Sequence, residues 1–206
     1  MTAPQQARAR GARMPRSARR KQLLHAARET FVAQGYHAAA MDGIAERAGV
    51  SKPVLYQHFP GKFDLYLALI DEHTAELVER VRSALRSTTD NKLRVAATFG
   101  AFFDFVEHEG EAFRLVFESD LRSKPEVRER LDAALSTCTD LVGQVIAEDT
   151  DLPPDGARLL ARGLVGTAEV SARHWLSVRD EMTKADAVDL LARLAWRGIS
   201  GWPRTT

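Results

Sequence analysis

The sequence predicts an all-α protein in two parts: an N-terminal three-helix helix-turn-helix domain, joined by a long helix to a helical C-terminal domain. Apolar residues recur at helical spacing along most of the 206 residues, and neither an alternating strand pattern of any length nor a repeat of fixed period occurs. A composition of 45% hydrophobic and 28% charged residues is typical of a soluble globular protein. A sizeable helical core is therefore expected.

At the N-terminus, residues 1–15 contain prolines, a glycine and arginines without an apolar period, so we expect a disordered basic tail. The first helix is expected from Ser17 to Gln34, because apolar residues share one of its faces at helical spacing. Gly35 would end this helix in the left-handed conformation that glycine adopts without strain.

Two short helices are predicted next, over residues 41–48 and from Ser51 to His58. Ser51 is expected to cap the second of them, and Pro53 suits its first turn, where the N–H that proline lacks would have no helical partner. Gly49 permits a tight turn between the two helices. This is the pattern of a helix-turn-helix, whose second helix enters the major groove of DNA. The domain is expected to cover residues 16–66.

Beyond the break at Pro60 and Gly61, a long helix is expected over residues 62–85. A loop is predicted at residues 88–91, and the helix that follows it is expected to end at residues 108–110. Further helices are predicted over residues 111–121, 125–147, 155–178 and 184–199. Residues 67–206 are expected to form the second domain.

The net charge of +1 hides an asymmetry along the chain. Residues 1–66 contain eleven Lys and Arg against four Asp and Glu, a net charge of +7, which leaves −6 for the remainder. A basic end favours a polyanion such as nucleic acid, and an acidic body is repelled from it. The alternative is a solvated basic tail with no partner.

The candidate DNA-binding residues combine positive charge with groups suited to phosphates and base edges. They are Arg16, Arg19, Arg20, Ser51, Lys52, Pro53, Tyr56, Gln57, His58 and Lys62.

The first third of the chain resembles a known family. The residues that carry the resemblance are Phe31, Gly35-Tyr36, Ile44-Ala45, Ala48-Gly49-Val50-Ser51, Leu55-Tyr56, His58-Phe59 and Lys62. Together they resemble the N-terminal signature of the TetR family of bacterial transcriptional regulators. The resemblance implies a DNA operator as partner, a C-terminal domain that binds a small effector, and a homodimer built mainly by the last two helices. Tyr56, His58 and Lys62 match positions implied to contact phosphate, whereas Ala39 and Ala40 replace the hydroxyl residues often found before the second helix.

Parts of the second half are similar to regulators of fatty-acid synthesis within this family. The similar stretches are residues 87–91, 102–108, 113–120 and 163–166, with Arg173 and Trp175. This similarity implies a long apolar tunnel that responds to long-chain acyl-CoA, and fatty-acid synthase genes as the target.

The middle of the chain is unusually aromatic, because six of the nine phenylalanines lie between Phe99 and Phe117. A helix that is apolar over so wide an arc is either buried on all sides or lines a cavity. The candidate ligand-binding residues are Phe102, Phe105, Phe113, Phe117, Leu135, Cys138, Leu164 and Thr167. Ordinary core packing is the alternative for each of them.

The last two helices carry small residues for close approach and large apolar residues for an interface. The candidate dimer residues are Gly163, Gly166, Ala168 and Ala172, with Leu160, Leu164, Trp175, Leu191, Leu194 and Trp196. The alternative is that they close the core of a single chain.

Other classes of protein receive little support from the sequence. No phosphate-binding loop, dinucleotide fingerprint, nucleophile elbow or HExxH motif occurs, so we expect neither an enzyme nor a cofactor. The histidines show no convincing metal-ligand spacing, and Cys138 is expected to be a small buried hydrophobe. Since no apolar run approaches ~20 residues and no signal peptide is recognisable, we expect a cytoplasmic protein that does not enter membranes.

Three alternatives remain open at this point. They are an architectural DNA-binding protein without an effector, a helical enzyme or carrier with an incidental basic tail, and a TetR-type repressor of an efflux or catabolic operon that responds to another apolar molecule.

Overall fold

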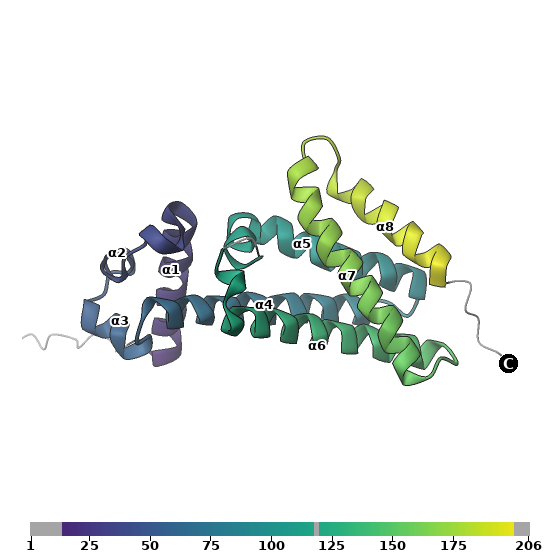
Figure 1. Ribbon diagram of the computed structural model, residues 1–206, viewed down its shortest axis with the longest axis horizontal. Helices are drawn as coiled ribbons and strands as arrows, with labels where there is room; N and C mark the ends of the chain where they lie inside the picture. The colour runs from purple at the N-terminus through teal and green to yellow at the C-terminus, as the bar shows by residue number, and fades with distance from the viewer. Residues whose placement is uncertain (1–13, 118–119, 200–206) are drawn as a thin grey trace, which may run out of the picture. The chain divides into compact units, whose positions relative to one another are not determined.

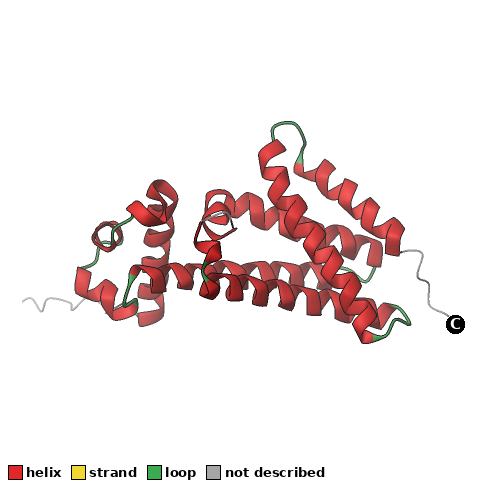
Figure 2. Ribbon diagram, viewed as in Figure 1, coloured by secondary structure: helices red, strands yellow, loops and turns green. Residues whose placement is uncertain are grey.

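A computed structural model describes the backbone of residues 14–117 and 120–199, and the side chains of these residues except 108–117, 120, 122, 198 and 199. Every regular element within these ranges is a helix, which confirms the all-α prediction (Figure 2). The elements are α1 (Arg16–Ala38), α2 (Met41–Arg47), α3 (Lys52–His58), α4 (Lys62–Arg86), α5 (Asn91–Phe117), the 3₁₀ helix η1 (Asp120–Ser123), α6 (Pro125–Asp149), α7 (Pro154–Val178) and α8 (Lys184–Ile199), and the α-helices are labelled in Figure 1. The contacts divide the chain into two compact units, Met1–Leu65 and Tyr66–Thr206.

The first unit is a three-helix arrangement around a small core. Leu23 and Phe31 of α1 are buried, as are Ile44 of α2 and Leu55 of α3. Gly49, with φ of 64°, makes the tight turn between α2 and α3, and the N–H of Val50 donates to the carbonyl of Ala45 at 3.0 Å. The predicted helix-turn-helix is therefore present, with glycine in the left-handed conformation that its turn requires.

The end of α1 and the start of α3 differ from expectation. Gly35 has the predicted positive φ of 76°, but one further helical turn follows it to Ala38. Ser51 occupies the N-cap position of α3 without a side-chain capping hydrogen bond, so that prediction is wrong. The reason lies in Pro53, which removes one of the two N–H groups that an N-cap side chain can reach, while the other, from Val54, donates to the carbonyl of Ser51 at 3.0 Å.

In the second unit, α5 is a single helix through Gly110 to Phe117. The predicted break at residues 108–110 and the separate helix over residues 111–121 are therefore wrong. One glycine inside a helix costs only about 1 kcal/mol relative to alanine, which is too little to end a helix without a proline or a cap beside it.

The core of the second unit lies where α5 meets α7 and α8, and α6 packs along α7. Phe102, Phe103 and Phe105 are almost fully buried, so three nearly consecutive aromatic residues face protein on different sides of α5. Helices α6 and α7 pack through small residues at Gly143 and Ala161. A Cβ at Gly143 would lie 3.5 Å from the Cβ of Ala161, an ordinary van der Waals contact, so alanine would also fit at position 143.

Three of the residues predicted to form a dimer interface belong to this core instead. Ala168, Ala172 and Trp175 are buried within the unit, and the Trp175 ring packs on Phe103 with 5.5 Å between centroids. The indole N–H of Trp175 donates to the carbonyl of Met182 at 2.8 Å, which also satisfies its polar atom. The prediction is wrong for these three, because α7 has two small-residue or apolar faces and the sequence does not show which one turns inward.

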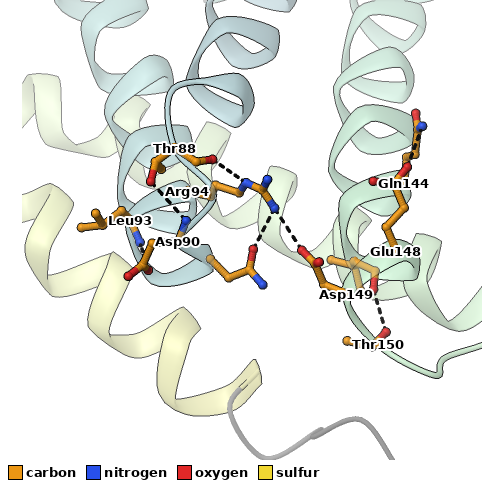
Figure 3. A network of polar contacts seen from close by, with 10 residues as sticks. Thr88, Asp90, Leu93, Arg94, Gln144, Glu148, Asp149 and Thr150 are labelled. Atoms are coloured by element: carbon orange, nitrogen blue, oxygen red, sulfur yellow. Dashed lines mark hydrogen bonds and ion pairs between the residues drawn. The ribbon is translucent and has the colours of Figure 1, made fainter.

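Two polar anchors hold α5 to its neighbours. At its start, the Arg94 guanidinium donates to the carbonyl of Thr88 at 2.8 Å, to Asn91 at 2.9 Å and to the Asp149 carboxylate at 3.0 Å (Figure 3). Further along, the Lys184 ammonium of α8 donates to Asp104 at 2.6 Å and also to Glu107. These two carboxylates raise the pKa of Lys184 by accepting hydrogen bonds from its charged form.

We predict that Arg94→Ala lowers the free energy of unfolding by about 1–3 kcal/mol, because it leaves partly buried polar groups without their charged donor. Arg158→Ala is the matched control, since Arg158 also bridges two helices, to Asp140 at 3.2 Å, but both side chains are more than half exposed. The control should cost less than about 1 kcal/mol. Urea unfolding followed by circular dichroism measures both, and equal losses would contradict a special role for Arg94.

Candidate functional site

The outward face of α3 presents most of the residues predicted to bind DNA. Because Leu55 is fully buried, helical spacing turns Lys52, Pro53, Tyr56 and Gln57 toward solvent, and all four are exposed. Tyr56 retains 41% of its accessible surface, which is unusual for a large aromatic side chain in a small domain. An exposed helix face of this kind can enter a groove without rearrangement.

A cavity of about 670 Å³ lies between the start of α1 and the outer side of α3. We call it the α1–α3 notch, and it is lined by Met14, Pro15, Arg16, Arg19, Val54, Gln57 and His58. Four residues predicted separately from the sequence, Arg16, Arg19, Gln57 and His58, are thus brought together. Two guanidinium groups beside an amide and an imidazole suit a phosphate of nucleic acid.

The arginines at the start of α1 have defined neighbours. Arg19 donates to the side chain of Gln22 at 2.8 Å, and Gln22 in turn donates to the carbonyl of Ala48 at the end of α2. Arg20 lies 4.5 Å above the centre of the buried Phe59 ring, a cation–π arrangement. These contacts hold the positive charges of α1 close to the ends of α2 and α3.

The surroundings of His58 lower the pKa of its imidazole. Its partial burial, followed by the charges of Arg16, Arg20 and Arg19, lowers the pKa of His58 from its ordinary value of 6.5. At pH 7 the ring is therefore neutral, and can donate a hydrogen bond to an anion through its single N–H.

The two lysines predicted to bind DNA differ in their exposure and in the groups that they contact. Lys52 forms an exposed ion pair with Asp42 at 2.8 Å, and the hydrogen bond to this carboxylate raises the pKa of Lys52. Lys62 is partly buried, and its ammonium donates to the carbonyls of Tyr36, His37 and Ala39 at 2.9, 3.1 and 2.9 Å.

Seven of the eight residues predicted to line an effector tunnel fall into three groups. Phe102, Phe105, Leu135 and Cys138 are buried in the core of the second unit, and burial raises the pKa of the Cys138 thiol to about 12. Leu164 is half-buried and lines a narrow cavity of about 20 Å³ together with Val95, Thr98, Phe99, Val142, Val165 and Ala168. The side chains of Phe113 and Phe117 lie outside the described residues.

Thr167 does not lie among these buried residues. Its side chain is exposed on α7, and its hydroxyl donates to the carbonyl of Gly163 at 2.8 Å. The placement of Thr167 inside a ligand cavity is therefore wrong. The buried stripe of α7 runs through Ala161, Val165 and Ala168, and Thr167 lies beside this stripe rather than in it.

Sequence reasoning missed a larger groove of about 540 Å³ formed by α5, α7 and α8. It is lined mainly by apolar residues, namely Phe103, Val170, Ser171, His174, Trp175, Val178, Glu181, Met182, Ala187, Leu190 and Leu191. Val170 and Leu190, which line the groove, are each 53% exposed, and α7 and α8 also expose Leu159 at 74% and Leu194 at 67%. The apolar spacing of Leu159 and Val170 on a second face of α7 is the signal that could have located this surface.

In the part of the chain that the structure describes, no group of three or more His, Cys, Asp and Glu side chains is placed to hold a metal ion. No helix in the same ranges combines the length and apolar character needed to cross a membrane.

An exposed helix-turn-helix beside a basic notch, together with a separate helical unit that has its own core, defines an all-α protein of the DNA-binding type. A family model described as bacterial regulatory proteins, tetR family, matches residues 23–69, and one described as tetracyclin repressor-like, C-terminal domain, matches residues 91–198. The chain belongs to the TetR family, as its N-terminal residues predicted.

Individual relatives support the same assignment. The chain is 50% identical over 196 residues to the HTH-type transcriptional activator FasR of Mycolicibacterium smegmatis, covering 95% of this chain and 90% of that protein. A TetR-like regulator from a Rhodococcus species has a similar structure, with a TM-score of 0.70 and 28% identity, covering 92% of this chain and all of the other. FadR from Bacillus subtilis, solved in complex with stearoyl-CoA, has a TM-score of 0.68 and 23% identity, covering 88% and 98% of the two chains.

Proposed function

We propose that this protein is a ligand-responsive transcriptional regulator that binds a specific DNA operator of fatty-acid synthesis genes and responds to long-chain acyl-CoA. The observation that carries the proposal is the 50% identity to the activator FasR along nearly the whole chain. The exposed face of α3 and the α1–α3 notch supply surfaces suited to an operator.

In this proposal α3 lies in the major groove, and the notch receives a phosphate of the flanking backbone. Gln57 is suited to specify sequence, because its amide can make two hydrogen bonds to an adenine edge. Arg16 and Arg19 are suited to neutralise phosphate, and the neutral His58 ring can donate to a phosphate oxygen. Lys52 can leave its exposed pair with Asp42 for phosphate, since an exposed ion pair is weak in water.

The DNA-binding role predicts different effects for Gln57 and Arg16. Gln57→Ala should alter preference at particular base pairs, at a typical cost of ~1–3 kcal/mol for a bidentate contact. Arg16→Gln should instead weaken binding to all duplexes, and reduce the slope of log affinity against log salt by about 0.9 per lost phosphate contact. Fluorescence anisotropy on a duplex selected from random sequence by the wild type, and on its scrambled form, measures both. Equal wild-type affinity for the two duplexes would contradict sequence-specific binding.

The operator role also needs two DNA-binding units, and we propose that α7 and α8 join two copies of the chain. The support is the exposed apolar face around Leu159, Val170, Leu190 and Leu194, which a protein in water normally covers. Gly163 and Gly166 of α7 leave open space around their Cα atoms, which allows a partner helix to approach closely. A two-fold dimer would present two α3 helices to the two halves of a symmetric operator.

Leu194→Glu is predicted to yield monomers that lose operator affinity, because a charge is placed in an apolar interface and a single unit reaches one half-site. Leu93→Glu is the matched control, since Leu93 is an exposed leucine of α5, with 56% of its surface accessible, and lies outside that face. Sedimentation velocity at micromolar concentration measures the oligomeric state. A wild-type monomer, or dimers of both variants, would contradict this interface.

For the effector, the core of the second unit is the proposed place of an acyl chain. The narrow cavity beside Leu164, Phe99 and Val142 is far too small for such a chain as it stands. Binding at this cavity therefore requires Phe99 and the other side chains that line it to move apart, and most of these side chains are apolar. An effector that favours this opened arrangement can bias DNA binding by a typical ~1–3 kcal/mol.

Operator affinity is predicted to change on titration with acyl-CoAs from C8 to C20, with longer chains acting at lower concentration. Each buried CH₂ contributes ~0.8 kcal/mol, which corresponds to about a fourfold change in affinity. Leu164→Phe, which fills the narrow cavity, should weaken the response of operator affinity to acyl-CoA. Leu160→Phe, at another half-buried position of α7, should leave this response unchanged. No change in operator affinity at any chain length would reject acyl-CoA, and would favour another apolar molecule as effector.

A further inference from the structure

Lys62, the first residue of α4, makes an unusually complete set of contacts with the connection between α1 and α2. An ammonium group has three N–H donors, and here they point to three backbone carbonyls, those of Tyr36, His37 and Ala39, at 2.9 to 3.1 Å. Its nitrogen also lies 4.7 Å above the centre of the Tyr36 ring. In this arrangement no donor of Lys62 remains for a phosphate.

These carbonyls need a partner because they lie where α1 ends. The last carbonyls of a helix accept no hydrogen bond from an N–H of the same helix, and the negative end of the helix dipole favours a cation beside them. Burial at this position makes the need stronger, because Ala39 is only 2% exposed. A neutral side chain at position 62 would leave these carbonyls without their charged donor.

The segment that Lys62 holds leads directly into the helix-turn-helix. Helix α2 begins at Met41, two residues after Ala39, and its far end is held separately by the hydrogen bond from Gln22 to the carbonyl of Ala48. The start of α2 thus depends on Lys62 and its end on Gln22. Because α3 follows α2 through the tight turn at Gly49, the direction of α3 depends on both contacts.

We propose that Lys62 is a positioning residue for DNA recognition: it fixes the α1–α2 connection, and thereby the direction of α3, without binding phosphate. This inference rests on the proposed operator binding. It replaces the phosphate contact that the family resemblance implies for Lys62. Charge alone is not sufficient for this role, since three carbonyls converging on one nitrogen require an ammonium group, and the planar guanidinium of arginine spreads its donors over three nitrogens.

The two roles differ in what they do to specific and non-specific binding. Loss of a phosphate contact weakens binding to every duplex and lowers the salt slope by about 0.9. Loss of a positioning contact changes the direction of α3. Affinity for the selected site then falls, while affinity for a scrambled duplex and the salt slope stay unchanged. We expect Lys62→Met to lower the ratio of specific to non-specific affinity at least tenfold, with Arg16→Gln as the variant that lowers the slope.

Lys62→Arg keeps the charge but changes the geometry of the donors. This variant is expected to have a lower ratio of specific to non-specific affinity than the wild type. A wild-type ratio for Lys62→Arg, or a salt slope reduced by about 0.9 in Lys62→Met, would overturn the proposal. Amide hydrogen exchange of both variants supplies a readout without DNA, in which residues 36–44 should lose protection while those of α1 before Gly35 keep it. Unchanged protection of residues 36–44 would also overturn it, whereas a wild type that selects no site would instead refute operator binding.

Discussion

The burial of Ile44 of α2 and Leu55 of α3 in the small core of the first unit is the constraint on which the DNA-binding surface depends. Both side chains are fully buried, so α3 cannot rotate about its axis without exposing apolar surface to water. This orientation leaves Lys52, Tyr56 and Gln57 outside. It also places one side of α3 next to the start of α1, which creates the notch. The functional face is therefore a consequence of what the small core must bury.

The core of the second unit imposes a different constraint, because its own side chains fill it. Protein interiors are close-packed, and the small cavity beside Leu164 is one place in this core that the described side chains leave unfilled. A ligand that enters this cavity must displace side chains that line it, such as Phe99, so part of its binding energy is spent in rearranging the unit. That expenditure is what permits a conformational response, since a ligand that fitted both arrangements equally would shift neither.

Much of the architecture could be predicted from the sequence, because prolines and glycines mark its boundaries. The expected helix over residues 125–147 corresponds to α6 (Pro125–Asp149), and that over residues 184–199 has the bounds of α8. The continuity of α5 through Gly110 could not be predicted, since one glycine is ambiguous in a helix. The orientation of α7 was equally hidden: it carries two apolar faces, and only the packing shows that Trp175 turns inward while Val170 is exposed. Backbone partners leave no trace in a sequence, which is why the contacts of Lys62 were missed.

The electrostatics of the first unit follow from the same packing. The stretch up to Leu65 carries the net charge of +7, and the structure concentrates part of it in one place by setting Arg16 and Arg19 beside His58. The partial burial of His58, followed by the charges of these arginines, disfavours a proton on the imidazole and keeps the pKa of His58 below its ordinary value. A phosphate diester in the notch, with its single negative charge, would offset part of this positive field. The positive charge of the notch is therefore carried by its arginines, and His58 adds a hydrogen-bond donor without adding to the repulsion between them.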